Sequence, residues 1–198
     1  MSDGLKLILT PDNPCNTLIT DSETGEKIYH VITEHTKDET TTKLKDAVGK
    51  QIASWRWRES SADVLTVGES KPQSSSGWLK KTLIPFKATV TFQSANGKEY
   101  KWKGNEPGGA LQLFDKQNKE TPIASFTKSR KYRNRQTDPP TEEFRDASIT
   151  LDSRGLEIQN EVVLSFLLLE RKRRTDETAT VSRAEALAIA PGEGLALA

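Results

Sequence analysis

The sequence contains a single cysteine, Cys15, so an intramolecular disulfide bond is excluded. Histidine is almost as rare, because His30 and His35 are the only two, and neither lies at a spacing typical of a metal site. The longest apolar run is far shorter than the about 20 residues needed to cross a bilayer, and no apolar signal segment is visible. We therefore expect a soluble, cytoplasmic protein that binds no metal.

An excess of charge of either sign is also lacking. The 198 residues include 29 lysines and arginines and 28 aspartates and glutamates, which gives a formal net charge of +1. A nearly neutral chain has no overall field that attracts nucleic acid, so we expect no nucleic-acid partner. Any attraction to an anionic ligand must come from a local cluster of cations.

The sequence patterns of common catalytic and nucleotide-binding sites are missing as well. No glycine-rich loop followed by the required lysine and hydroxyl residue is present, and no Gly-x-Ser-x-Gly occurs. Cys15 would need a histidine base close in space to act as a nucleophile. We therefore expect a protein that is not an enzyme, with no cofactor and no catalytic residues.

Short segments with alternating apolar and polar residues make up most of the chain before residue 152. Leu5, Leu7 and Leu9 are spaced as in a strand, and Asn96-Gly97 separates two strand-like segments as in a tight hairpin. About eleven such strands follow one another at the spacing expected of an antiparallel sandwich or barrel. Each strand has one apolar face, so the sheet they form must pack that face against another apolar element.

The apolar residues are concentrated in one stretch, residues 162–169, which is followed shortly by four cations. A helix that is apolar on all sides must be buried on all sides, so we expect a helix over residues 156–173 with the sheet wrapped around it. Residues 152–155 can turn and cap this helix. Residues 175–198 contain too few large apolar groups to pack, which predicts one domain of residues 1–174 and a flexible tail.

One combination of residues resembles a known family. The first strand ends in Asn13-Pro14-Cys15-Asn16-Thr17, which is followed by Asp21, Thr24, Gly25 and Tyr29. Together with the many strands and a terminal apolar helix ending in Glu-Arg-Lys-Arg-Arg, this pattern resembles an uncharacterised domain common in basidiomycete fungi. That domain is grouped with the tubby-like folds, whose members include the tubby C-terminal domain, the plant LURP-one-related proteins and the phospholipid scramblases.

The resemblance covers residues 5–174 and implies a mainly β fold. It implies an antiparallel barrel of twelve strands around one central C-terminal hydrophobic helix, in agreement with the pattern of strands and helix described above. The fungal domain itself implies no biochemical activity. The wider group suggests binding of membrane phospholipid or phosphoinositide, although fold analogy alone is a weak argument for function.

Two clusters of cations are candidate anion-binding sites. The first contains five cations and one tyrosine, Tyr132, without an acid among them; the cations are Lys128, Arg130, Lys131, Arg133 and Arg135. Arginine forks bind phosphate through two hydrogen bonds, and lysines add point charge. We favour a solvated strand and loop whose charge is offset by Glu142, Glu143 and Asp146, with an anion-binding face as the alternative.

The second cluster, at the end of the predicted helix, comprises Arg171, Lys172, Arg173 and Arg174. Cations at a helix C-terminus interact favourably with the helix dipole, and they also keep the helix from entering further into the sheet. We favour this structural role, with binding of anionic lipid or nuclear import as the alternatives.

The tryptophans are the remaining candidates for a binding surface. Trp55 and Trp57 lie two residues apart, so both face one side of a strand. Packing in the core or at the rim of the sheet is the favoured interpretation, and a sugar-binding or membrane-inserting aromatic face is the alternative.

The sequence thus predicts a non-enzymatic β-barrel binding module. It would bind anionic phospholipid or phosphoinositide head groups through a basic face at residues 128–135, with residues 171–174 as the other candidate, as a protein peripheral to the membrane. The alternative is a structural or protein-interaction domain with no lipid ligand. The sequence does not decide the oligomeric state.

Overall fold

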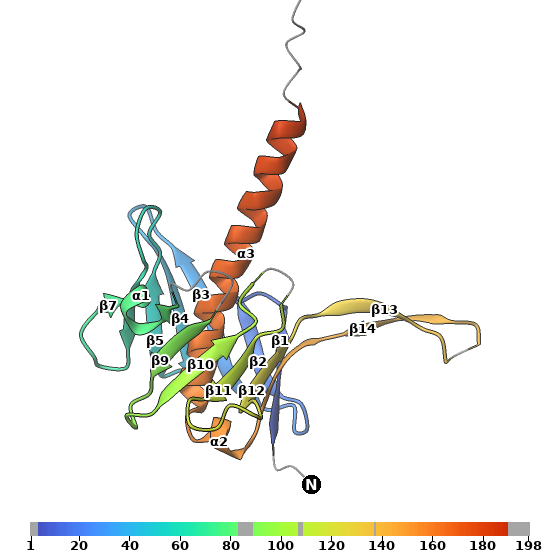
Figure 1. Ribbon diagram of the computed structural model, residues 1–198, viewed down its shortest axis with the longest axis horizontal. Helices are drawn as coiled ribbons and strands as arrows, with labels where there is room; N and C mark the ends of the chain where they lie inside the picture. Colours follow the sequence, from blue (N-terminus) through green and yellow to red (C-terminus); the bar gives the residue numbers. More distant parts are fainter. Residues whose placement is uncertain (1–3, 83–88, 107–108, 137, 190–198) are drawn as a thin grey trace, which may run out of the picture.

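The computed structural model describes residues 4–82, 89–106, 109–136 and 138–189 (Figure 1). Parts of the strand-like segments predicted before the Asn96-Gly97 hairpin fall in residues 83–88, outside the described residues, and so does the end of the predicted tail, residues 190–198. The described chain is mainly β structure with a long C-terminal helix, which confirms the predicted fold class at this level.

The fold is dominated by one antiparallel sheet of 13 strands. Its strand order is β7-β6-β5-β4-β3-β2-β1-β15-β12-β11-β10-β9-β8, so two meanders are joined through β15 in the middle. Its strands are β1 (Leu5–Thr10), β2 (Thr17–Asp21), β3 (Lys27–His35), β4 (Thr40–Asp46), β5 (Gln51–Arg56), β6 (Val64–Val67), β7 (Gln73–Ser74), β8 (Lys80–Lys81), β9 (Val90–Gln93), β10 (Glu99–Lys103), β11 (Gln112–Asp115), β12 (Ala124–Thr127) and β15 (Ala147–Leu151). A separate pair, β13 (Arg130–Asn134) and β14 (Thr141–Arg145), forms a hairpin of its own.

The sheet curls until its two edges lie near each other. The edge strands β7 and β8 are joined in the chain by a single short helix, α1 (Ser75–Trp78), which contacts both of them. In the described residues no backbone pairing links β7 to β8, so the sheet differs from the closed barrel that was predicted. The two-residue length of both edge strands is one way in which a sheet limits pairing at an exposed edge.

Two local predictions about turns are confirmed. Asn96-Gly97 lies in a tight hairpin between β9 and β10, where Gly97 adopts φ of 80°, a region that favours glycine. Before the C-terminal helix, the carboxylate of Asp152 accepts hydrogen bonds from the backbone N–H groups of Arg154 and Gly155 and caps α2 (Ser153–Leu156).

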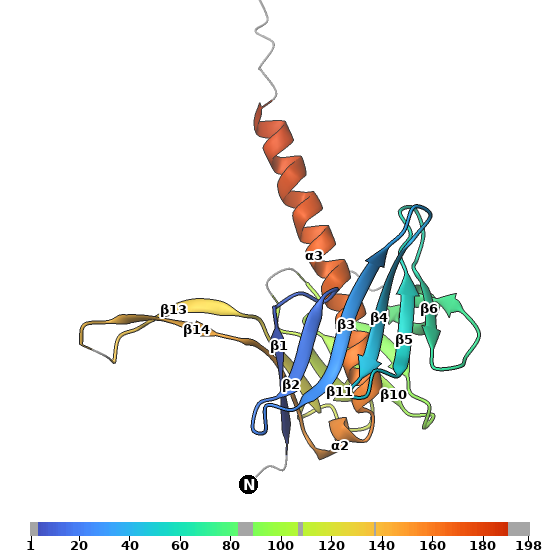
Figure 2. The ribbon, with the colours of Figure 1, turned by 180° about the vertical axis from the view of Figure 1, so that it is seen from behind.

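The helix α3 (Gln159–Ile189) supplies the centre of the core. Every residue from 162 to 170 is buried, including Phe166 and Leu167, each with no exposed surface. Strands β9 to β12 pass on one side of this half of the helix in Figure 1, and β1 to β5 pass on the other side in Figure 2. The one hydroxyl within the apolar stretch, Ser165 Oγ, accepts a hydrogen bond from Trp102 Nε1 at 2.9 Å. The predicted central helix is therefore confirmed.

The predicted limits of that helix are wrong at both ends. The first turn belongs to the separate helix α2, and α3 then continues unbroken past residue 173 to Ile189. Residues 175 and later were predicted to form a flexible tail, but neither proline nor glycine occurs between Arg174 and Ile189 to stop the helix. Beyond Arg174 the helix leaves the sheet, and its side chains up to Ser182 are exposed apart from the half-buried Glu177 (Figure 1).

Among the described residues, no helix is long and apolar enough to cross a membrane.

Candidate functional site

The five cations of the first predicted cluster lie on a projecting hairpin, which we call the arm (residues 128–146). The strands β13 and β14 of the arm pair in antiparallel register, with Arg130 opposite Arg145 and Asn134 opposite Thr141. The arm extends well away from the sheet and the helix (Figures 1 and 2). Sequence alone indicated a polar segment here and did not predict the two strands.

The predicted exposure of the cations is confirmed. All five side chains are exposed: Lys128, Arg130, Lys131, Arg133 and Arg135. In the part of the chain that the structure describes, none of the five forms an ion pair. The acids of β14 therefore do not neutralise these cations through direct contact.

The acid nearest the centre of the arm is engaged by uncharged groups instead. Glu143 accepts hydrogen bonds from Tyr132 Oη and from Asn134 Nδ2, both at 2.6 Å. These hydrogen bonds hold the pKa of Glu143 below its ordinary value of 4.5, and the same contact raises the pKa of Tyr132 above 10.0. The Arg145 guanidinium lies 5.7 Å from the centre of the Tyr132 ring. These contacts consolidate one face of the arm.

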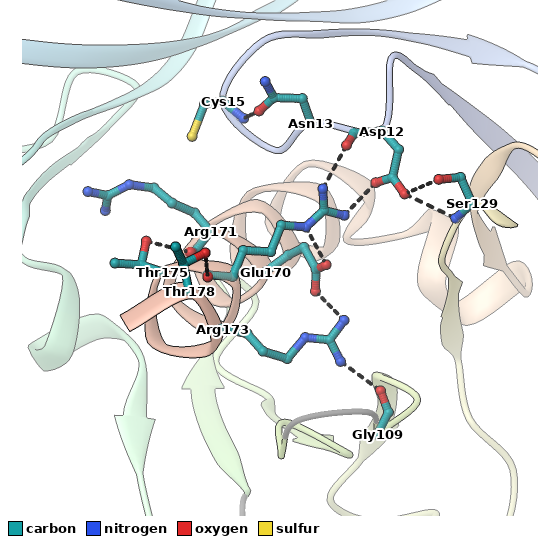
Figure 3. A network of polar contacts seen from close by, with 11 residues as sticks. Asp12, Asn13, Cys15, Gly109, Ser129, Glu170, Arg171, Arg173, Thr175 and Thr178 are labelled. Atoms are coloured by element: carbon teal, nitrogen blue, oxygen red, sulfur yellow. Dashed lines mark hydrogen bonds and ion pairs between the residues drawn. The ribbon is translucent and has the colours of Figure 1, made fainter. Parts of the chain in front are cut away.

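The cations of the second predicted cluster lie where α3 leaves the sheet, and most of them are neutralised. Three guanidinium groups pair with three carboxylates in what we call the exit cluster, formed by Asp12, Asp63, Glu170, Arg171, Arg173 and Arg174. Figure 3 shows the part of this cluster around Glu170. Equal numbers of positive and negative groups leave this cluster without net charge. The three arginines were predicted as anion-binding residues, and the structure places them among internal partners.

Glu170 is the centre of the exit cluster and has no exposed surface. Its Oε1 accepts a hydrogen bond from Arg174 Nε at 2.7 Å. Its Oε2 lies 2.6 Å from Arg173 Nη2, an ion-pair distance without the angle of a hydrogen bond. Arg173, which is 7% exposed, also donates from Nη1 to the backbone carbonyl of Gly109 at 2.7 Å.

The remaining arginine of the exit cluster, Arg171, joins the helix to the opposite wall of the sheet. It pairs with Asp63, and its guanidinium lies 4.0 Å from the centre of the Trp57 ring. Trp55 is fully buried, whereas Trp57 is half-buried. This placement favours the packing interpretation of both tryptophans.

Asp12 connects the exit cluster to the base of the arm. Its carboxylate pairs with Arg174 and accepts hydrogen bonds from the backbone N–H of Ser129 at 3.0 Å and from Ser129 Oγ at 2.6 Å (Figure 3). Burial raises the pKa of Asp12, but the hydrogen bonds from Ser129 and Arg174 outweigh it, so the pKa lies below 3.8. The direction of the arm is thus fixed at Ser129 by a charge on the main body.

Lys172 is the exception among the helix cations. Its side chain is 68% exposed and lies 3.5 Å from Asp176 one turn later, a surface pair of small energetic value. Lys172 and the five cations of the arm are therefore the predicted site residues that remain available to an external anion.

The described residues show no group of three or more metal-ligating side chains. Cys15 lines a surface cleft with Trp57 and Arg171. Burial raises the pKa of the Cys15 thiol above 9.0, even though Arg171 and Arg174 act in the opposite direction. A thiol with a raised pKa stays protonated at neutral pH and is a weak nucleophile.

Comparison with known proteins identifies the family without giving a function. Residues 12–175 match the Family of unknown function (DUF6593), and the chain belongs to this family. No curated protein matches the chain. It is similar to the X-ray structure of a protein from Arabidopsis thaliana, with 12% sequence identity, a TM-score of 0.40 and coverage of 85% of this chain and 90% of that one.

Proposed function

We propose that this protein is a non-enzymatic binding module whose arm binds anionic phospholipid or phosphoinositide head groups at a membrane surface. One observation carries the proposal: the five arm cations lack internal ion-pair partners among the described residues, whereas each arginine of the exit cluster is paired with a carboxylate. Free, clustered cations on a projecting arm can approach phosphate groups without breaking existing ion pairs. Each cation near an anionic leaflet contributes about 1 kcal/mol.

The fold is compatible with the same proposal. We propose that the curled sheet and its central helix are a variant of the tubby-like barrel, in which the gap between β7 and β8 is spanned by α1. Support comes from the single buried helix and the antiparallel meanders on either side of it. The proposal places the protein in the cytoplasm, peripheral to a membrane.

Sedimentation with liposomes tests the proposed function. Wild-type protein should sediment with vesicles of phosphatidylcholine containing phosphatidylserine and phosphatidylinositol 4,5-bisphosphate, and added salt should weaken the binding. The variant Arg130→Gln/Lys131→Gln/Arg133→Gln removes three cations from the arm. Its affinity should fall by at most about 3 kcal/mol, roughly two orders of magnitude.

A matched triple variant separates position from total charge. Lys37, Lys71 and Lys119 are exposed, form no ion pair with any described residue, and lie outside the arm. Changing these three to glutamine lowers the net charge equally and should leave vesicle binding close to that of wild type. Equal losses in both triple variants, or no binding by wild type at low salt, would favour an interaction domain without a lipid ligand.

A further inference from the structure

The arm continues the register of the main sheet, and this continuity determines which side chains share a face. Thr127 pairs with Ser148 in β12–β15, and Arg130 pairs with Arg145 in β13–β14, so the two pairs of strands are in one register. Successive residues of a strand point to opposite faces. Tyr132 therefore lies on the face that continues the core-facing side of β12, and Lys131 lies on the opposite face.

The face that carries Tyr132, which we call the inner face, is occupied by its own contacts. Tyr132 and Asn134 both donate to Glu143, and Arg145 lies near the Tyr132 ring. Tyr132, Asn134 and Glu143 satisfy one another. Arg130 lies on the same face opposite Arg145 and is exposed, so the inner face offers a cation while its aromatic ring is already engaged.

The opposite or outer face combines an apolar ring with cations. Phe144 lies directly across from Lys131, and Arg133 follows on the same face opposite Glu142. The Phe144 side chain is 60% exposed, although it is one of the largest apolar groups in the chain. A two-stranded ribbon has no second layer that could bury this ring, so the ring stays in water until a ligand covers it.

A membrane interface fits this arrangement better than a hydrophilic ligand does. Amphipathic elements with cations on the polar side place aromatic rings among the upper acyl chains, while the long stems of lysine and arginine reach the phosphate level. The outer face offers the ring and the cations side by side at the same height on the ribbon. The two components match the two layers of an anionic bilayer surface.

From these contacts we infer that the arm enters the membrane interface through its outer face, with the Phe144 ring inserted below the head groups and Lys131 and Arg133 bound to phosphate. The inference deepens the proposed function and rests on it. It adds an apolar component that salt does not screen, so part of the membrane binding persists at high ionic strength.

A fluorescent label tests the insertion directly. Cys15 is the only cysteine, so Cys15→Ser provides a background for single labelling. In that background Phe144→Cys carries an environment-sensitive fluorophore, and Val48→Cys, at a turn residue that is 89% exposed, carries the same label as a control. With phosphoinositide-containing vesicles, the label at position 144 should shift to shorter wavelength and be quenched by lipids brominated on their acyl chains. The label at position 48 should do neither.

A second measurement uses the otherwise natural chain. Phe144→Ser should weaken vesicle binding about tenfold at high salt, because it removes most of one apolar side chain from the interface. Val48→Ser should have no effect.

The outcomes distinguish the insertion from the proposed function. If the arm triple variant loses binding while the label at position 144 stays in water, the insertion is refuted and electrostatic binding by the arm stands. If the wild-type protein does not bind vesicles at all, both fail. A spectral shift at position 144 with another protein, but not with vesicles, would also overturn the insertion.

Discussion

The buried charges of the exit cluster predict an unusually large effect for the variant Glu170→Gln. Glu170 has no exposed surface, and it is the carboxylate that faces Arg173, which is 7% exposed. Without the Glu170 charge, Arg174 keeps Asp12, but Arg173 keeps only the carbonyl of Gly109. Breaking a buried ion pair on one side leaves an uncompensated charge and costs about 3–5 kcal/mol. The free energy of unfolding of a typical domain is roughly 5–15 kcal/mol, so this loss would be a large part of it.

Urea unfolding followed by tryptophan fluorescence measures how much the free energy of unfolding falls in Glu170→Gln, provided that the m-value is unchanged. The melting temperature should fall by roughly 6–20 °C, since each kcal/mol corresponds to about 2–4 °C in a chain of this size. Glu99→Gln is the matched control, because it makes the same chemical change in a surface ion pair. The Glu99 side chain is 39% exposed and that of its partner Lys116 is 60% exposed. That control should lose no more than about 1 kcal/mol.

A second substitution tests the mechanism of the loss. If the uncompensated charge of Arg173 causes the instability, then Glu170→Gln/Arg173→Met should be more stable than Glu170→Gln alone. Two results would refute the reasoning: a Glu170→Gln variant as stable as Glu99→Gln, or a double variant whose loss equals the sum of the two single losses.

The remaining predictions concern acid stability and the end of the helix. Because the pKa of Asp12 is lowered by folding, its contribution to stability is present above the unfolded value near 3.8 and is lost as the pH falls below it. Asp12→Asn should therefore flatten the acid limb of a stability–pH profile, and an unchanged limb would contradict this. Truncation after Arg174 should change the melting temperature by less than a few degrees, because the described side chains removed are largely exposed; a fall of ten degrees or more would show that this segment is docked.

A structural feature was predictable from the sequence when the residues that form it lie close together along the chain. The central helix was predictable because residues 162–169 are apolar on all sides, and that pattern is local. The Asn96-Gly97 hairpin was predictable for the same reason. By contrast, Arg174 and Asp12 are 162 positions apart, and Arg171 and Asp63 are 108 apart, so no local pattern indicates these two pairs. Only the pairing of Glu170 with Arg173 and Arg174, three and four residues later on the helix, has a local signal.

The arm shows the same limitation in a different form. Its residues are too polar to show the alternating pattern of a strand. The strands β13 and β14 continue the register of β12 and β15, and this pairing does not require an apolar face. Phe144 was therefore missed as a candidate residue. The signal that could have found it is a large apolar residue within an otherwise charged segment, close to the predicted cation cluster.

The continuous register of the arm also bears on how this protein can change over time. Because β12 and β15 already pair with each other, the residues between Lys128 and Ala147 form an insertion into a complete sheet. Pairs of residues can be added to or removed from this insertion without moving any side chain of the core. The main body can thus remain constant while the arm varies in length and chemistry, so the surface that the arm presents and the folding of the main body can change independently within one chain.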